Sequence, residues 1–406
     1  MSVGRKHNAA VIGSLALLCS LVFADWTQLT SGTPRDLNSV AFPEGTQVGY
    51  AVGAGGTIVK TTDGGANWTP QVSGTPNGLN SVYFVDNSTG YAVGATGTGL
   101  KTTDGGATWN SMSVGASQDL RAVQFVGGAG YTCSYQPTGG STLYKTTDAG
   151  ASWQPLGLPG AAARATCLCF ASQSLGLVAG LGGYVVRTID GGQSFEYLGP
   201  GTTQYFYGVA FARNSTTTAY IVGDTATIIK TADAGTYWSP MNAPYADVYR
   251  SVCAPVDASN AYAVGGGGEE GGMIVKNIGT SFWYHQNSGA STTLNSVCFP
   301  NGNDTGYVVG VGGVILKTTD GGGTVGVGGG SERVVTRAAV RVVSNPSRHG
   351  IALHADANVA VSVIDVSGRV VMSQAATKGR NFLPLRKAGV YVVKAGTETA
   401  EAVVTD

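Results

Sequence analysis

Charge and histidine are scarce in this 406-residue sequence, and their scarcity excludes several classes of function. Only 12% of the residues are charged, and 24 acidic residues balance 24 basic ones at a formal net charge of zero. The chain therefore lacks the basic surface that attracts nucleic acids or anionic membranes, and we expect no nucleic-acid partner. The one histidine between residues 25 and 325 is His285, which argues against a His-based triad or a metal–histidine site. We expect no cofactor and no metal.

Cysteine is scarce as well, and its spacing argues against two common uses. No CxxC pair occurs, so a structural zinc site is not expected. Cys167 and Cys169 stand two apart on an expected strand, where they share a face and are poor partners for each other. An odd number of cysteines lies beyond residue 24, which argues against a complete disulfide framework. We interpret most of them as small buried residues, and whether any disulfide forms stays open for Cys133, Cys167, Cys169, Cys253 and Cys298.

Long apolar runs are missing except near the start of the chain. Arg5 and Lys6 precede an apolar run over residues 11–23, and Ala24 offers a small residue at a cleavage position. The run is short for a membrane span, and Asp25 follows it at once. We therefore predict a cleaved secretory signal peptide over residues 1–24 and a secreted or cell-surface location.

Glycine, in contrast, is abundant, and it marks an internal repeat. It makes up 63 of the 406 residues, and at regular intervals it follows an aspartate in a recurring turn. The aspartates of this turn are Asp63, Asp104, Asp148, Asp190, Asp233 and Asp320. Their spacings are 41, 44, 42, 43 and 87 residues, and a decayed copy over residues 276–283 fills the last, double gap. The sequence thus contains seven repeats.

Each repeat predicts four short strands. A first strand such as residues 37–42 is followed by Gly-Tyr-Ala-Val-Gly at 49–53, a third strand at 57–60 and a fourth that begins at Trp68. Apolar and polar residues alternate with a period of two, and helical spacing is missing. Four strands per repeat of this length are typical of a propeller blade. We predict an all-β fold with a seven-bladed β-propeller over residues 25–325.

The start of the chain is expected to close the ring. In the seventh repeat Val325 stands where most other repeats have tryptophan, so the fourth strand of that repeat is missing. Residues 26–33, Trp-Thr-Gln-Leu-Thr-Ser-Gly-Thr, match residues 68–75, Trp-Thr-Pro-Gln-Val-Ser-Gly-Thr. We predict that this N-terminal strand completes the last blade and covers an edge that would otherwise be free to pair.

The aspartate turn has a local chemistry that favours a structural role. An Asp carboxylate accepts hydrogen bonds from backbone N–H groups of its own turn, glycine adopts positive φ there, and the tryptophan covers the turn. Seven near-copies cannot all be one active site. The turn is similar to the Asp-box, or BNR repeat, of sialidases, xyloglucanases and sortilin-type receptors.

A longer pattern carries a further resemblance. Leu-Asn-Ser-Val-x-Phe, Gly-Tyr-x-Val-Gly and Lys-Thr-Thr-Asp-Gly-Gly-x-x-Trp together resemble the photosystem II assembly and stability factor family over roughly residues 25–325. The resemblance implies the propeller fold and says little about the role. Sialidases also carry an Arg-Ile-Pro motif, which is missing here, and the acidic residues outside the turns show no evident pairing of the kind that glycosidases use. We therefore expect no enzyme and no catalytic residue.

A binding face is expected where the first strands begin. The second residue of each first strand forms a series that we predict to line the channel mouth: Asn38, Asn80, Arg121, Thr166, Tyr207, Arg250 and Asn295. Two insertions between the second and third strands, residues 135–140 and the loop with Glu269 and Glu270, are further candidates, because such loops often carry function. The alternative is that these residues are ordinary hydrogen-bonded strand ends and solvated loops.

The last part of the chain has a different pattern. A Gly-rich linker is predicted over residues 326–337, and alternating segments after it predict a small β-sandwich over residues 338–406. Asn345-Pro346, Asp365-x-x-Gly-Arg369 and Ala388-Gly-Val-Tyr391 resemble, in order, the marks of the C-terminal sorting domain of the type IX secretion system. The resemblance implies that this module is recognised by that secretion machinery in a Bacteroidota-like cell. The alternative is an immunoglobulin-like accessory domain.

The preferred hypothesis is an exported, non-catalytic and monomeric propeller that binds a protein or a glycan. The second hypothesis is a glycoside hydrolase or lyase on the same ring, for which a facing carboxylate pair is the discriminating feature. The third is an assembly or stability factor for a membrane complex. The identity of the ligand does not follow from the sequence.

Overall fold

The computed structural model describes residues 26–160, 163–257, 260–268 and 271–323, together with most of residues 340–405. The predicted signal peptide (1–24) and linker (326–337) lie outside the described residues, as do Glu269 and Glu270. The described residues form an all-β structure whose helices are three short 3-10 turns, η1 (Ala54–Gly56), η2 (Ala95–Gly97) and η3 (Val311–Gly313). None of them has the length to cross a membrane.

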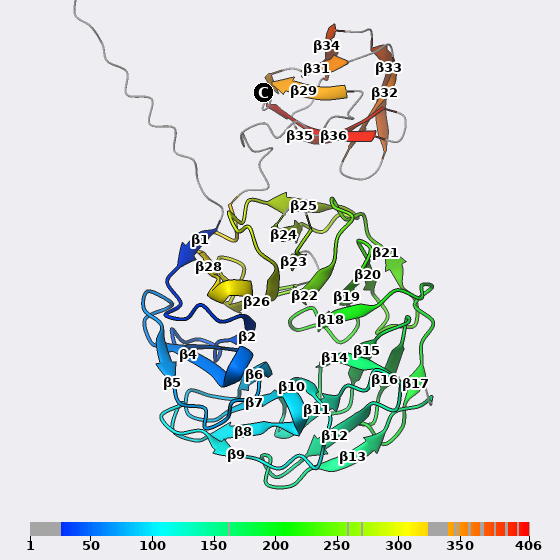
Figure 1. Ribbon diagram of the computed structural model, residues 1–406. Helices are drawn as coiled ribbons and strands as arrows, with labels where there is room; N and C mark the ends of the chain where they lie inside the picture. Colours follow the sequence, from blue (N-terminus) through cyan, green and yellow to red (C-terminus); the bar gives the residue numbers. More distant parts are fainter. Residues whose placement is uncertain are drawn as a thin grey trace, which may run out of the picture.

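Seven four-stranded antiparallel sheets stand as blades around a central channel (Figure 1). In blades 1 to 6 the strands follow in chain order from the channel outwards. These strands are β2 (Leu37–Ala41), β3 (Gly49–Gly53), β4 (Thr57–Thr61) and β5 (Thr69–Gln71); β6 (Leu79–Phe84), β7 (Gly90–Gly94), β8 (Gly99–Thr102) and β9 (Asn110–Ser111); β10 (Leu120–Val126), β11 (Ala129–Ser134), β12 (Thr142–Thr146) and β13 (Gln154–Gly157); β14 (Ala165–Phe170), β15 (Gly176–Gly180), β16 (Val185–Thr188) and β17 (Glu196–Tyr197); β18 (Phe206–Phe211), β19 (Ala219–Gly223), β20 (Ile228–Thr231) and β21 (Ser239–Pro240); β22 (Tyr249–Cys253), β23 (Ala261–Gly266), β24 (Gly272–Asn277) and β25 (Trp283–Gln286).

Blade 7 is completed by the start of the chain, as the sequence predicts. It contains β26 (Leu294–Asn301), β27 (Thr305–Gly310), β28 (Ile315–Thr318) and, as its outer strand, β1 (Thr27–Leu29). Thr27 pairs with Lys317 and Leu29 with Ile315. Trp26, beside this strand, is 2% exposed. Its ring meets Phe299 edge-on with centroids 5.9 Å apart, and its Nε1–H donates to Gln286 Oε1 at 3.0 Å.

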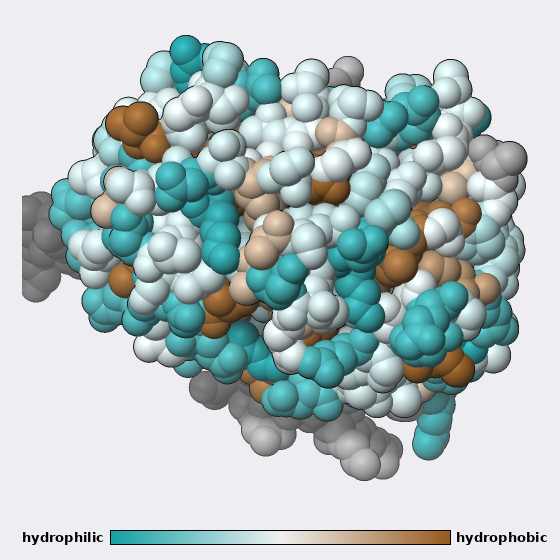
Figure 2. Space-filling view, turned by 90° about the horizontal axis from the view of Figure 1, so that it is seen from below, coloured by the Kyte–Doolittle hydropathy of each residue, from teal (hydrophilic) through white to brown (hydrophobic). Residues whose placement is uncertain are grey.

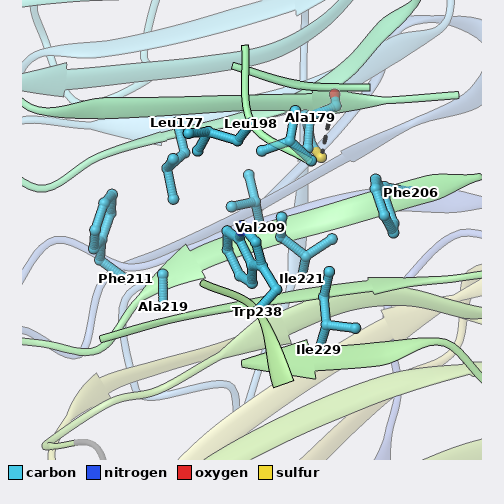
Figure 3. Close-up of a cluster of buried hydrophobic side chains, with 12 residues drawn as sticks. Leu177, Ala179, Leu198, Phe206, Val209, Phe211, Ala219, Ile221, Ile229 and Trp238 are labelled. Carbon is cyan, nitrogen blue, oxygen red and sulfur yellow. Dashed lines mark hydrogen bonds between the residues drawn. The ribbon is translucent and has the colours of Figure 1, made fainter. Parts of the chain in front are cut away.

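The hydrophobic core lies between neighbouring blades. Figure 3 shows one such layer, in which Leu177 and Leu198 of blade 4 face Phe211, Ile221 and Trp238 of blade 5. Successive side chains of a strand point to opposite faces of its blade, and neighbouring blades cover both faces, so second strands such as β3 are buried along their whole length. The rim of the propeller, seen from below in Figure 2, is mainly hydrophilic, and its hydrophobic residues form small separate patches.

The aspartate turns form a hydrogen-bonded loop at the end of each third strand. In blade 1, Thr61 Oγ1 donates to Asp63 Oδ1 at 2.8 Å, and the same carboxylate oxygen accepts the backbone N–H of Asn67 at 2.9 Å. The bond from Asn67 is the first cause of a pKa of about 2 for the Asp63 carboxyl, below its ordinary 3.8. In blade 6 the decayed turn is held by an uncharged group: the Asn277 amide donates to the carbonyls of Thr280 and Phe282.

A tyrosine and a lysine of one blade donate hydrogen bonds to the aspartate turn of the next blade. Tyr50 OH and Lys60 Nζ of blade 1 both donate to the carbonyl of Gly105 in the turn of blade 2, at 2.7 and 2.6 Å. The lysine nitrogen lies 5.5 Å from the centroid of the same tyrosine ring. The same pair of donors recurs around the ring, as Tyr91 with Lys101, Tyr131 with Lys145, Tyr262 with Lys276, and Tyr307 with Lys317. The Tyr of Gly-Tyr-x-Val-Gly and the Lys before the turn thus join blade to blade.

The C-terminal strands form the predicted small sandwich. They are β29 (Val340–Ser344), β30 (Ser347–Arg348), β31 (Gly350–Ala355), β32 (Val359–Asp365), β33 (Val370–Ala376), β34 (Gly379–Pro384), β35 (Gly389–Ala395) and β36 (Glu398–Thr405). One sheet has the order β29-β31-β34 and the other β30-β36-β35-β32-β33. Ile351 and Leu383 of the first sheet share a core with Val361, Val363 and Val393 of the second.

Candidate functional site

The seven residues predicted to line the channel mouth surround one cavity. It has a volume of about 620 Å³ and is lined by all seven together with Tyr135, Leu181 and Tyr205. Because each inner strand runs away from this mouth, the second returns and the third runs away again, the aspartate turns lie at the opposite end of the channel. The mouth and the turns are therefore separate surfaces.

A β-bulge at the start of each inner strand places these side chains. In blade 1, Leu37 pairs with Gly53 and Ser39 with Val52, so Asn38 between them is an extra residue without a partner in β3. The same shift occurs in the other six blades. A bulge turns the extra side chain out of the sheet, here into the channel. A Cβ on Gly53 would lie 1.8 Å from the carbonyl oxygen of Asp36, so only glycine at this position lets the backbone before β2 approach the end of β3 so closely.

At four of the seven positions the side chain donates a hydrogen bond to the neighbouring blade. Asn38 Nδ2 donates to the carbonyl of Leu79 in the next blade at 2.9 Å, and Asn80 repeats this bond to Leu120. Asn295 bonds the Leu37 carbonyl in the same way across the closure of the ring, and Thr166 donates to the carbonyl of Phe206. These four side chains therefore satisfy a backbone group of the neighbouring blade. At these positions the geometry matches the alternative reading as hydrogen-bonded strand ends.

The other three positions hold Arg121, Tyr207 and Arg250, and none of them makes this inter-blade bond among the described residues. Arg121 Nη2 lies 3.2 Å from Asp119 Oδ2, and its guanidinium lies 4.7 Å from the centroid of the Tyr135 ring. Arg250 is exposed and has no hydrogen-bond or ion-pair partner in the part of the chain that the structure describes. Burial raises the pKa of the Tyr207 hydroxyl, with a smaller contribution from the charge of Asp224.

The cavity is consequently asymmetric. Asparagines line the side formed by blades 7, 1 and 2, whereas blades 3 to 6 contribute two arginines, three tyrosines, a threonine and a leucine. Acidic groups nearby are bound to backbone N–H groups: Asp119 Oδ1 accepts from Thr96, and Asp224 Oδ1 accepts from Tyr205. The cationic side of the cavity thus keeps at least the charge of Arg250 available to a ligand.

The site offers binding groups and no obvious catalytic group. The ten described residues that line the cavity include no carboxylate, histidine or cysteine, and no group of three potential metal ligands occurs among the described residues. The five described cysteines are free thiols. Burial raises the pKa of Cys253 to about 12 and that of Cys298 to about 11, so these thiols stay protonated and are poor nucleophiles.

Three lining residues lie outside the predicted series of bulge positions: Tyr135, Leu181 and Tyr205. Tyr205 precedes its inner strand directly, Leu181 follows β15, and Tyr135 opens the insertion over residues 135–140 that was singled out as a loop. A usable signal exists for Tyr205, because no other repeat has an aromatic residue immediately before its inner strand. Glu269 and Glu270, the other two predicted ligand-binding residues, lie outside the described residues.

The two kinds of ring position predict opposite effects on stability. Asn80→Ala removes the hydrogen bond to the Leu120 carbonyl, and we expect the free energy of unfolding to fall by about 1 kcal/mol. Arg121→Gln removes one partly exposed ion pair, and we expect a change within about 0.5 kcal/mol. Urea unfolding of both variants beside the parent protein measures the difference. A larger loss for Arg121→Gln would contradict this assignment of roles.

Fold and turns define the class: the chain is a seven-bladed Asp-box propeller with a small C-terminal sandwich. Within it, residues 71–198 match the sequence profile of a family described as photosynthesis system II assembly factor YCF48. The propeller therefore resembles that family, as the sequence pattern indicates. No curated protein sequence matches the chain.

Solved structures similar to this chain include two of YCF48. The first, YCF48 bound to D1 peptide, is 20% identical, with a TM-score of 0.59, covering 74% of this chain and 98% of that chain. The second, YCF48 from Cyanidioschyzon merolae, is 17% identical, with a TM-score of 0.60, covering 72% of this chain and 98% of that chain. The WD40 propeller domain of Doa1 is 12% identical, with a TM-score of 0.57, and 73% of this chain and 98% of that domain are covered. At these identities the likeness concerns the fold.

Proposed function

We propose that the channel mouth binds a carboxylate-bearing peptide segment of a partner protein, and that the propeller is a non-catalytic binding module. The observation that carries this proposal is the division of the ring. Four of seven equivalent bulge residues bond the next blade, whereas Arg121, Tyr207 and Arg250 point into the cavity without such a bond. Arginine is well suited to hold a carboxylate, because its planar guanidinium presents paired N–H donors.

Two further points support a protein ligand. A similar structure contains YCF48 with a D1 peptide bound, which makes peptide binding the natural comparison for a propeller of this type. The three tyrosines beside the arginines supply rigid apolar area with a polar end, a combination enriched at protein-binding sites. A role as an assembly factor for a membrane complex would use the same binding chemistry. A glycosidase would instead need a carboxylate pair, and the described lining of the cavity contains none.

We also propose that the protein is exported. Support comes from the signal-peptide pattern of residues 1–24 and from the three sorting-domain motifs within residues 338–406. In this proposal the type IX secretion machinery recognises the C-terminal sandwich, and the propeller acts outside the cell or at its surface. Loss of export after removal of residues 338–406, measured by fractionation of the producing cells, is the expected result. Unchanged export would contradict the proposed role of the sandwich.

A peptide screen tests the binding site. The full chain is screened against random octapeptides with a free carboxyl terminus, and the binders are remeasured with an amidated terminus. We expect Arg121→Gln and Arg250→Gln each to weaken binding by at least about tenfold, which is the scale of a lost charge-assisted hydrogen bond.

The matched control for these variants is Arg213→Gln. Arg213 follows β18 at the aspartate-turn end of the channel, where it lies 3.6 Å from Glu44. This variant should bind the peptides like the parent protein. Equal binding by the parent, Arg121→Gln and Arg250→Gln would refute the choice of site, and equal binding of free and amidated peptides would refute the role of the terminal carboxylate.

A further inference from the structure

A second hollow adjoins the channel mouth at blade 4. It has a volume of about 460 Å³ and its walls are mainly apolar. Pro159, Arg164, Leu181, Tyr184 and Tyr197 are among the residues that line it, and Leu181 also lines the central cavity. The two hollows therefore share a wall, and a ligand that occupies the mouth can extend over Leu181 into the second one.

The apolar floor of this hollow is fixed by hydrogen bonding and ring contacts. Tyr184 is 6% exposed, and its hydroxyl donates to the carbonyl of Pro159 at 3.0 Å. The ring of Tyr197 meets it edge-on, with centroids 5.9 Å apart. Tyr197 itself is 59% exposed, an unusual position for a large aromatic side chain in a protein whose other tyrosines are mostly covered. Such a preformed apolar recess is suited to receive a single aliphatic or aromatic side chain.

Arg164 gives the hollow one polar anchor. Its side chain is half-buried, and its Nε–H is shielded from solvent without an acceptor. No carboxylate pairs with its guanidinium anywhere in the described chain. A buried donor without an acceptor is unfavourable, and the neighbouring N–H groups of the same guanidinium are left to bond a group from outside the protein.

We infer that this blade-4 subsite receives an apolar side chain of the same peptide whose carboxylate binds at Arg121 and Arg250, while Arg164 donates to a backbone carbonyl of that peptide. The inference rests on the proposed function of the mouth. A sugar fits the subsite poorly, because it presents a hydroxyl on nearly every carbon and needs several polar partners, whereas these walls are mainly apolar. The subsite would give the propeller specificity for sequence, beyond the attraction of any carboxylate.

The octapeptide screen extends to this subsite. We expect the enriched peptides to share a large apolar residue at a fixed distance from the free carboxyl terminus. Each peptide is then compared with its version in which that residue is alanine. Tyr197→Ser and Arg164→Gln should weaken the apolar peptide about five- to tenfold, and Tyr197→Ser should leave the alanine version unchanged. Tyr237→Ser is the matched control, since Tyr237 is 69% exposed in the blade-5 turn at the opposite end of the channel.

The outcomes separate the two proposals. Arg121→Gln should weaken both versions of the peptide, because the mouth binds the carboxylate in each. If Arg121→Gln does so while Tyr197→Ser affects neither version or both equally, the subsite is overturned and the proposed mouth stands. If Tyr197→Ser acts selectively but Arg121→Gln and Arg250→Gln have no effect, the mouth is overturned and the apolar subsite stands alone. A screen that enriches no peptide overturns both.

Discussion

Deletion of residues 26–33 is expected to abolish the cooperative unfolding of the propeller. The deletion removes β1 and leaves the outer edge of β28 without a partner, so blade 7 ends in an open strand edge. It also removes Trp26, whose buried ring packs the start of β1 against Phe299 of the inner strand β26. Loss of a buried aromatic side chain alone costs about 3–5 kcal/mol, a large part of the roughly 5–15 kcal/mol that stabilises a typical domain.

Differential scanning calorimetry provides the measurement. We expect the parent protein to show a sharp transition for the propeller, and the deletion variant to show a broad one at a much lower temperature. The melting temperature of Trp26→Ala should lie between those of the parent and the deletion variant. That of Trp26→Phe should lie closer to the parent, because this variant keeps an aromatic ring and loses only the bond to Gln286 and part of the ring area.

The chain offers a matched control for the closing strand. Gln28→Pro should be tolerated, because Pro70, Pro155 and Pro240 occupy the same place, two residues after the tryptophan, in the outer strands of blades 1, 3 and 5. On an outer strand a proline N lacks a donor that the sheet does not need. A deletion variant that unfolds in one sharp transition at the parental temperature would contradict closure by this strand.

The repeat made most of the fold predictable. Each blade uses the same local chemistry, so the spacing of the aspartates counted the blades. The count includes blade 6, where Gly279 stands in place of the aspartate and the Asn277 amide bonds the turn. The match of residues 26–33 to 68–75 located the closing strand. The partners of the repeated side chains were less accessible. Nothing in a single repeat shows that Tyr50 and Lys60 meet the carbonyl of Gly105 in the following blade.

The sequence allowed us to predict which positions line the candidate site, but not which of them bond the next blade and which are left for a ligand. The second residue of each inner strand was identified as mouth-lining, yet the bulge that places it there depends on pairing with a strand farther along the chain. Asn80 and Arg121 occupy equivalent positions in their repeats, and the sequence alone does not distinguish their roles. Only the contact with the next blade separates them, since one bonds the Leu120 carbonyl and the other an aspartate beside the cavity. Tyr135 and Leu181 reach the mouth from loops, where no periodic pattern identifies them.

The aspartate turns predict a steep loss of stability in acid. In four turns the carboxyl pKa is held at about 2, below the ordinary 3.8, and it is lowered in the turns of Asp233 and Asp320 as well. In the four turns the leading cause is a hydrogen bond from the residue four positions later, such as Thr108 to Asp104. The folded protein thus favours the charged form more than the unfolded chain does. The resulting stabilisation is complete above about pH 4 and is lost as the pH falls toward 2.

Because six carboxyls share this window, their effects should add, and the melting temperature should drop steeply between about pH 4 and pH 2. The cause is short-range hydrogen bonding, so about 0.5 M NaCl should leave the slope of melting temperature against pH largely intact, whereas a slope set by exposed ion pairs would flatten.

The triple variant Asp104→Asn, Asp148→Asn, Asp190→Asn should melt at a lower temperature than the parent at pH 7. Its melting temperature should fall less on acidification, since fewer groups take up protons on unfolding. An unchanged acid slope in this variant would show that the carboxylates of the turns do not control acid stability. The blade-6 turn, held by the uncharged amide of Asn277, shows that the fold accommodates a neutral turn at one of its seven positions, so the variant is expected to fold.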